Sequence, residues 1–183
     1  GQCDEYRVHV VLNQNPSANE ALYPRRSAHT ELLLGQDYAM LRPEFLARRD
    51  AERRFPDTAD RLLVTMGAAD PANATAVCVD ACGLLSGASL RVRVVLGPSN
   101  PNGEALRKRT NDGRIEFVQP DAEGGTPALM AWAHLAVCSP ASPMHATFFM
   151  AVPPAPLLPA ATPSSIAQPL AAPRPATPSR CPP

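Results

Sequence analysis

Apolar and polar positions alternate in blocks through the middle of the chain, residues 61–138. Short apolar runs of strand length are separated by longer segments with helical spacing. The pattern predicts strands over 62–66, 90–96 and 115–118, and helices over 72–85, 103–110 and 126–138. Strands that alternate with helices form βαβ crossovers and a parallel sheet. One more strand is predicted near the start of the chain, over residues 8–12.

The segment that follows the strand over 62–66 is the most informative of the chain. Gly67 permits a tight turn that a Cβ would obstruct. Asp70 and Pro71 are predicted as the N-cap and the first residue of the next helix. Backbone N–H groups at a helix start bind anions, so the segment predicts a site for a diphosphate. An ordinary βα turn explains the same residues.

Polar and small residues also follow two other predicted strands. Gly97, with Asn100 behind it, lies at the end of the strand over 90–96, on the sheet edge that Gly67 shares. Ligands of open α/β sheets bind beyond the carboxyl ends of the strands, so the two loops support one site. Asn13 and Asn15 follow the first strand, and they either contact a ligand or cap local turns.

Composition excludes several classes of partner. The 183 residues have a formal net charge of zero, which gives no basic surface for nucleic acid or an anionic membrane. No apolar run approaches the ~20 residues that span a bilayer, and no signal peptide precedes the first strand. Cys78 and Cys82 share a helix face without further ligands, so we expect buried thiols, no metal site and a cytoplasmic protein.

Two segments differ in composition from this α/β region. Residues 49–60 are rich in Arg, Asp and Glu and are interpreted as a solvated connector. Residues 139–183 hold 13 of the 22 prolines and no Asp or Glu. From residue 171 onward Pro, Ala, Ser and Thr dominate, which predicts a disordered tail over 171–183.

The segment over residues 64–75 resembles the motif Val-Thr-x-Gly-Gly-Ser-Asp-Pro-x-Asn-x-Thr. This motif is typical of the UDP-2,4-diacetamido-2,4,6-trideoxy-β-L-altropyranose hydrolases of pseudaminic acid synthesis, relatives of the MurG-type glycosyltransferases. Further segments are similar to the same family in the same order, namely 12–15, 33–35, 38–45, 94–101 and 129–136. The resemblance is specific over residues 8–138 and fades beyond them.

The resemblance implies an α/β fold with a Rossmann-like parallel sheet, as in the C-terminal half of a glycosyltransferase-B-like architecture. Residues 1–48 would be the remnant of an N-terminal domain and the crossover, and 61–170 the nucleotide-sugar-binding domain, degraded after 138. The family's catalytic His and glycine-rich loop belong to the N-terminal domain, so the catalytic residues stay unassigned. The four histidines of the chain, His134 on the last predicted helix among them, are interpreted as structural or solvent-facing.

The implied activity is hydrolysis of a UDP-linked diacetamido sugar, which needs no cofactor. The implied substrate-binding residues follow strand ends, namely Gly67, Ala68, Ala69, Asp70, Asn73, Gly97, Asn100, Asn13 and Asn15. Pro140 and Ala146 depart from the family pattern, because Pro140 has no N–H for a phosphate and Ala146 replaces a carboxylate. We therefore expect an incomplete or inactive version. A glycosyltransferase-like enzyme and a non-catalytic nucleotide- or partner-binding fragment are the alternatives.

Overall fold

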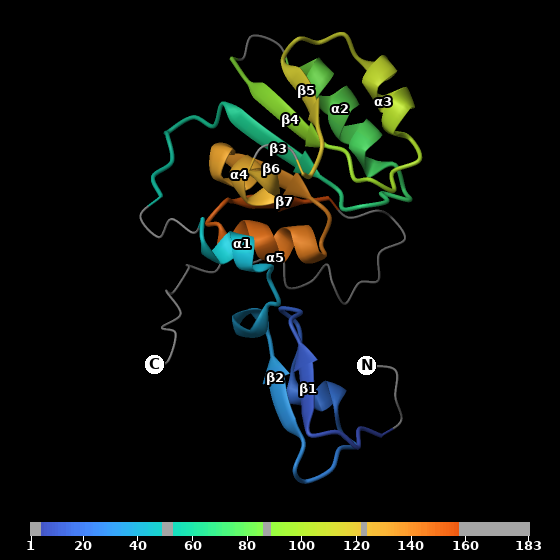
Figure 1. Cartoon of the computed structure of the whole chain (residues 1–183), viewed down its shortest axis with the longest axis vertical. Coiled ribbons are helices and arrows are strands. Elements are labelled where there is room, and N and C mark those ends of the chain that lie inside the picture. The colour runs from blue at the N-terminus through green and yellow to red at the C-terminus, as the bar shows by residue number, and fades with distance from the viewer. Residues whose placement is uncertain (1–4, 49–52, 86–88, 122–123, 158–183) are drawn as a thin grey trace. The chain divides into compact units, whose positions relative to one another are not determined.

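The computed structural model describes residues 5–48, 53–85, 89–121 and 124–157 (Figure 1). These residues belong to two compact units, which divide between Met40 and Leu41. The predicted disordered tail, 171–183, lies outside the described residues, as does part of the predicted connector.

The first unit is a small parallel pair of strands. Strand β1 (Val10–Asn13) pairs in parallel with β2 (Glu31–Leu34), and two 3-10 helices, η1 (Glu20–Leu22) and η2 (Gln36–Tyr38), flank β2. The strand predicted over 8–12 is confirmed, although it begins two residues later. Tyr23 is the buried centre of this unit, and its ring meets the Tyr6 ring edge-on at 5.1 Å.

The second unit is a five-stranded parallel sheet flanked by helices. In chain order its elements are α1 (Pro43–Leu46), β3 (Arg61–Thr65), α2 (Ala74–Leu84), β4 (Arg91–Val95), α3 (Gly103–Arg109), β5 (Ile115–Val118), α4 (Gly125–Trp132), β6 (Leu135–Cys138), α5 (Ser142–Phe149) and β7 (Pro154–Pro156). The spatial order is β5-β4-β3-β6-β7, so the chain moves outward from β3 and then returns to its other side. This is the Rossmann-like strand order, and it confirms the predicted α/β fold.

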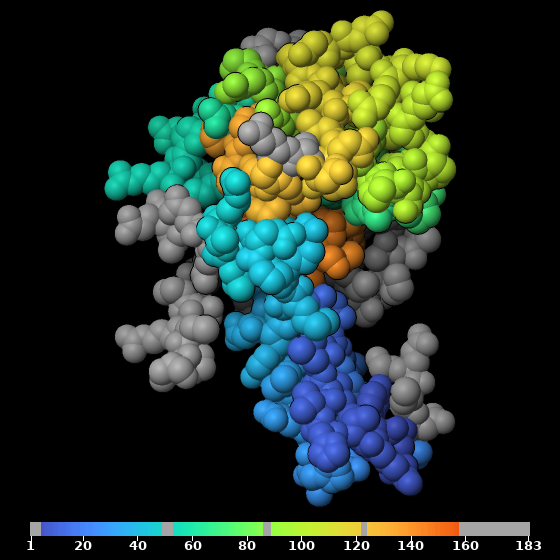
Figure 2. All heavy atoms as spheres, viewed as in Figure 1, coloured from blue at the N-terminus to red at the C-terminus, as the bar shows by residue number. Residues whose placement is uncertain are grey.

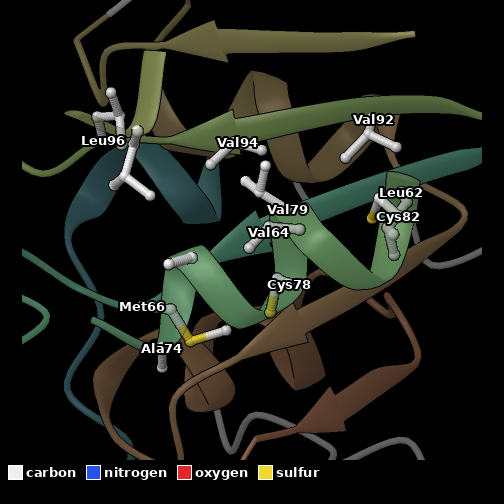
Figure 3. Close-up of a cluster of buried hydrophobic side chains, with 12 residues drawn as sticks. Leu62, Val64, Met66, Ala74, Cys78, Val79, Cys82, Val92, Val94 and Leu96 are labelled. Carbon is white, nitrogen blue, oxygen red and sulfur yellow. The ribbon is translucent and has the colours of Figure 1, made fainter. Parts of the chain in front are cut away.

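Helices α2 and α3 cover one face of this sheet. Val64 of β3 and Val94 of β4 point toward α2, where Cys78 and Val79 meet them in a buried cluster (Figure 3). The side chains on this face come from alternate strand positions, as the pleat requires. Cys78 is buried as expected, and that burial raises the pKa of its thiol to about 11.

Helices α1, α4 and α5 cover the opposite face. Leu63 and Val95 pack there with Met130 of α4 and Met150, which follows α5. Phe45 of α1 joins the same cluster, and the space-filling view shows α1 in cyan on the outer surface of this layer (Figure 2). The sheet therefore has a separate core on each face, which is typical of doubly wound folds.

Arg53 of the charged segment is bound to this second layer rather than solvated. Its guanidinium donates to the carbonyl oxygens of Met130 at 2.9 Å and Met150 at 3.4 Å, and also to that of Ala133. These carbonyls lie at the C-terminal ends of α4 and α5, where a cation is favourable. Arg53 thus links two helix ends.

The helix predicted over 126–138 is wrong in its last six residues, 133–138. Helix α4 ends at Trp132, and Leu135–Cys138 forms strand β6 between β3 and β7. Leu-Ala-Val-Cys has no Gly or Pro before it and is too short to show a period, so the pattern continued the helix. His134 consequently lies between the two elements, with Nδ1 2.9 Å from Asp60 Oδ1.

Candidate functional site

Strands β4 and β5 are added on one side of β3, whereas β6 and β7 are added on its other side. The strand order therefore reverses between β3 and β6, and the candidate site lies at this point. Ser139, which follows β6, donates its N–H to Thr65 O of β3 at 3.2 Å. Gly67 has φ +86°, and a Cβ added there would come 4.0 Å from Ser139 Oγ. We call the loops 67–70 and 139–141 the switch-point edge. In open α/β sheets, ligands bind in the crevice at this point.

Free backbone donors lie in the first of these loops. The N–H groups of Gly67, Ala68 and Ala69 have no hydrogen-bond acceptor among the residues that the structure describes. Ala68 and Ala69 are exposed. Consecutive N–H groups without partners can hold an anion, and small side chains leave room for it to approach. The three predicted residues therefore lie together and offer donors.

Asp70 is a helix cap, but not in the predicted position. It has φ +42°, and its buried carboxylate accepts the N–H groups of Ala74 and Thr75, both at 2.9 Å. The N-cap residue is Asn73, in the left-handed conformation that Asn tolerates, so Pro71 is not the first helical residue. A carboxylate already occupies the start of α2. The donors for a second anion must therefore come from loop 67–70 and not from α2.

Asn73 has an unused acceptor at the same place. Its side chain makes no capping hydrogen bond, and Oδ1 is buried without a partner in the described structure. Asn73 is thus the N-cap residue by its backbone position, but its side chain does not cap the helix. A buried amide oxygen without a donor is costly.

Gly97 is required by packing between two strand-end loops. A Cβ added there would lie 2.3 Å from Ala68 O and 2.5 Å from Ala68 Cα. Ser99 donates its N–H to Ala68 O at 3.1 Å, which holds the loops together. The loop after β4 thus positions the loop after β3. Asn100 caps its own turn, because its Oδ1 accepts the Asn102 N–H at 2.8 Å.

An open cavity of about 340 Å³ lies at the carboxyl ends of β4 and β5. Gly97 and Asn100 line it together with Arg107 of α3 and Gln119, which directly follows β5. The predicted site did not include Arg107 and Gln119. Gln119 had a usable signal, since it is the first polar residue after the strand 115–118 and lies on the same edge as Gly97. Arg107 had none, because nothing local distinguishes it from its basic neighbours.

Asn13 and Asn15 belong to the first unit and have local explanations. Asn13 Nδ2 donates to the Tyr23 hydroxyl at 2.8 Å, and its Oδ1 accepts the Asn15 N–H at 3.1 Å. The intervening Gln14 accepts the Met40 N–H at 2.9 Å. These contacts support local turn capping. A ligand contact through Asn13 or Asn15 stays a prediction.

The second loop of the switch-point edge offers fewer donors than the first. Pro140 has no N–H, and the Ala141 N–H is bonded to Ser139 O at 2.8 Å. His145 of α5 is 5% exposed and its Nδ1 has no partner within the described residues. Burial lowers the pKa of this imidazole. The neutral form therefore predominates at pH 7, and His145 adds no positive charge for a phosphate.

The described residues contain no group of three or more His, Cys, Asp or Glu side chains placed to hold a metal ion. No helix in these ranges has the length and apolar character needed to cross a bilayer. No protein-family model matches the chain, and no curated protein matches it significantly.

Proposed function

We propose that the second unit binds the UDP part of a UDP-linked diacetamido sugar at the switch-point edge. The observation that carries the proposal is the run of three unbonded N–H groups at Gly67, Ala68 and Ala69, beside the point where the strand order reverses. A diphosphate is the ligand whose oxygens match consecutive backbone donors. The sequence resemblance suggests which diphosphate ester.

The neighbouring cavity has room for the rest of such a ligand. The cavity near Gly97 and Gln119 adjoins the donor loop through the contact between Gly97 and Ala68. Asn100 Nδ2 has no acceptor in the described part of the chain and can donate to a carbonyl or hydroxyl. Arg107 adds one guanidinium that can donate to a phosphate oxygen, while Glu104, which also lines the cavity, is paired with Lys108.

The reaction proposed from the resemblance is attack of water on the sugar, with UDP as the leaving group. Within the second unit we assign binding of UDP and not activation of the water. The Asp70 carboxylate already accepts two N–H groups at the start of α2, so it is not free to activate a water. A non-catalytic nucleotide-binding unit is the second candidate, favoured by Pro140 in the second loop and Ala146 in α5, where the family pattern has a phosphate donor and a carboxylate.

Two measurements on the purified chain test the proposal. In an NMR titration with UDP, the amide signals of Gly67, Ala68 and Ala69 should shift most, and UDP release from the UDP-sugar should not exceed a buffer blank. Shifts confined to other residues would contradict the binding site. Turnover without an added acceptor would show a complete hydrolase, and turnover only with an acceptor would show a transferase.

A further inference from the structure

A second cavity lies at the amino ends of β4 and β5, opposite the switch-point edge. Its volume is about 270 Å³, and Arg91, Arg93, Arg114, Glu116 and Trp132 line it. Arg91 is the first residue of β4, whereas the proposed UDP site follows the last residues of the strands. The two sites therefore use opposite edges of one sheet. We call this second cavity the arginine cavity.

Arg93 is held rigidly in the arginine cavity with most of its donors unused. Its Nε donates to Glu116 Oε2 at 2.9 Å, and its guanidinium carbon lies 4.4 Å from the centre of the Trp132 ring. These contacts fix the plane of the guanidinium while 31% of the side chain stays exposed. Neither terminal nitrogen has an acceptor among the described residues. The two terminal nitrogens of the Arg93 guanidinium, which can bind an oxyanion through two hydrogen bonds, are therefore free and held in a fixed plane.

The charge around Arg93 is not balanced by the protein. Arg91 lies two residues earlier on the same face of β4, and its exposed side chain has no acceptor in the described ranges. Arg61 pairs directly with Arg91 across the strands, and like charges in this position repel. The buried Nε of Arg61 also lacks a partner among the residues described. Two carboxylates lie at this end of the sheet, that of Glu116 beside Arg93 and that of Asp60, which precedes Arg61 and approaches His134 Nδ1 at 2.9 Å. Three arginines against these two carboxylates leave one positive charge in excess.

In Arg114, by contrast, all three guanidinium nitrogens already donate hydrogen bonds within the protein. It binds the Asp112 carboxylate through Nε and Nη2, and it donates to the carbonyl oxygens of Leu85 and Cys82 at the end of α2. Arg114 is therefore a structural residue. The open donors of the arginine cavity are those of Arg91 and Arg93, with the unbonded Gly113 N–H beside them.

We propose that the arginine cavity binds the phosphate group of a small molecule. Two open guanidinium groups and a backbone N–H supply paired donors and positive charge, the combination that recognises phosphate. The volume lies just below the ~300 Å³ at which sites for drug-sized ligands begin, so the ligand is phosphate itself or a small phosphate ester. This site is independent of the proposed UDP site.

Trp132 provides a specific reporter, because it is the only tryptophan of the chain and it lines the arginine cavity. The full chain is titrated with inorganic phosphate while NaCl keeps the ionic strength constant, and Trp132 fluorescence is recorded. We expect a saturable change, with affinity at least tenfold lower in Arg91→Gln and in Arg93→Gln. Arg54→Gln is the matched control, because Arg54 is an exposed arginine outside the cavity.

Arg91→Gln keeps the test valid if Arg93→Gln disturbs the packing of Trp132, since the Arg91 side chain has no partner to lose within the described residues. A fluorescence change that stays linear in phosphate, or one equal in Arg91→Gln and Arg54→Gln, would overturn the proposal. A phosphate response lost in Ala69→Asp, a variant of the switch-point edge, would overturn it as well. The titration is then repeated with a sugar monophosphate. If it binds more tightly than inorganic phosphate, the ligand of the cavity is a phosphate ester, and if it binds more weakly, the ligand is free phosphate.

Discussion

Replacing Gly97 by Ala tests whether the loops after β3 and β4 are packed as closely as the structure has them. The added Cβ would lie 2.3 Å from Ala68 O, roughly 1 Å closer than carbon and oxygen ordinarily approach. The atoms that it meets are backbone atoms, which cannot rotate away as a side-chain tip can. Overpacking of this kind costs about 1–3 kcal/mol, and we expect Gly97→Ala in the upper half of that range.

Gly113→Ala is the matched control, because no atom lies within 4 Å of its added Cβ and its φ is not in the left-handed region. That change should be neutral or stabilise by about 0.4–1 kcal/mol through the unfolded chain. Urea unfolding followed by Trp132 fluorescence measures both variants in the second unit. Equal midpoints for Gly97→Ala and Gly113→Ala would refute the close approach. A displaced loop in Gly97→Ala should also weaken UDP binding.

Three further predictions concern groups whose roles follow from the structure. Arg53→Ala should lower the free energy of unfolding by about 2 kcal/mol, because it removes charged donors from two helix ends; urea midpoints unchanged from the parent would contradict this. Hydrogen bonding from Arg114 lowers the pKa of Asp112 to about 2 from 3.8, so the contribution of Asp112 to stability is fully present above about pH 4 and is lost as the pH drops toward 2. In Asp112→Asn this slope should diminish, as pH-dependent urea unfolding would measure. Burial raises the thiol pKa of Cys78 and of Cys138 to about 11, so peptide mapping after iodoacetamide at pH 8 should find both unmodified in the folded chain and modified in urea.

Strands β3, β4 and β5 could be predicted within about one residue, because each is a short segment rich in Val, Leu, Ile or Phe that is followed two residues later by Gly or Pro. Strand β6 could not, since Leu135–Cys138 continues the apolar character of α4 and owes its strand geometry to hydrogen bonds with β3 and β7. Without β6 the strand order, and with it the reversal at the switch-point edge, was not accessible from the pattern.

The position of the candidate site in the loop after β3 could be predicted from the sequence, but the contacts that this loop makes could not. The donor loop at Gly67 follows from local chemistry. The role of Gly97 depends on Ala68, 29 residues earlier in the chain, so the sequence suggested room for a ligand where the structure has a backbone contact. Asp70 was predicted to cap α2 and does so, but the left-handed Asn73 moves the helix start by several residues. A spacing rule that assumes a standard cap cannot foresee that change.

The central claim is that the loop 67–70 binds the diphosphate of UDP, and calorimetric titration of the full chain with UDP tests it most directly. Three proteins are compared, namely the parent chain, Ala69→Asp and Ala81→Asp. Ala69 is exposed beside the free N–H groups, whereas Ala81 is exposed on α2 away from the strand ends. The parent should bind UDP, Ala69→Asp should bind at least tenfold more weakly, or about 1.4 kcal/mol, and Ala81→Asp should match the parent. A parent chain that does not bind UDP, or equal affinities in all three folded proteins, would contradict the account.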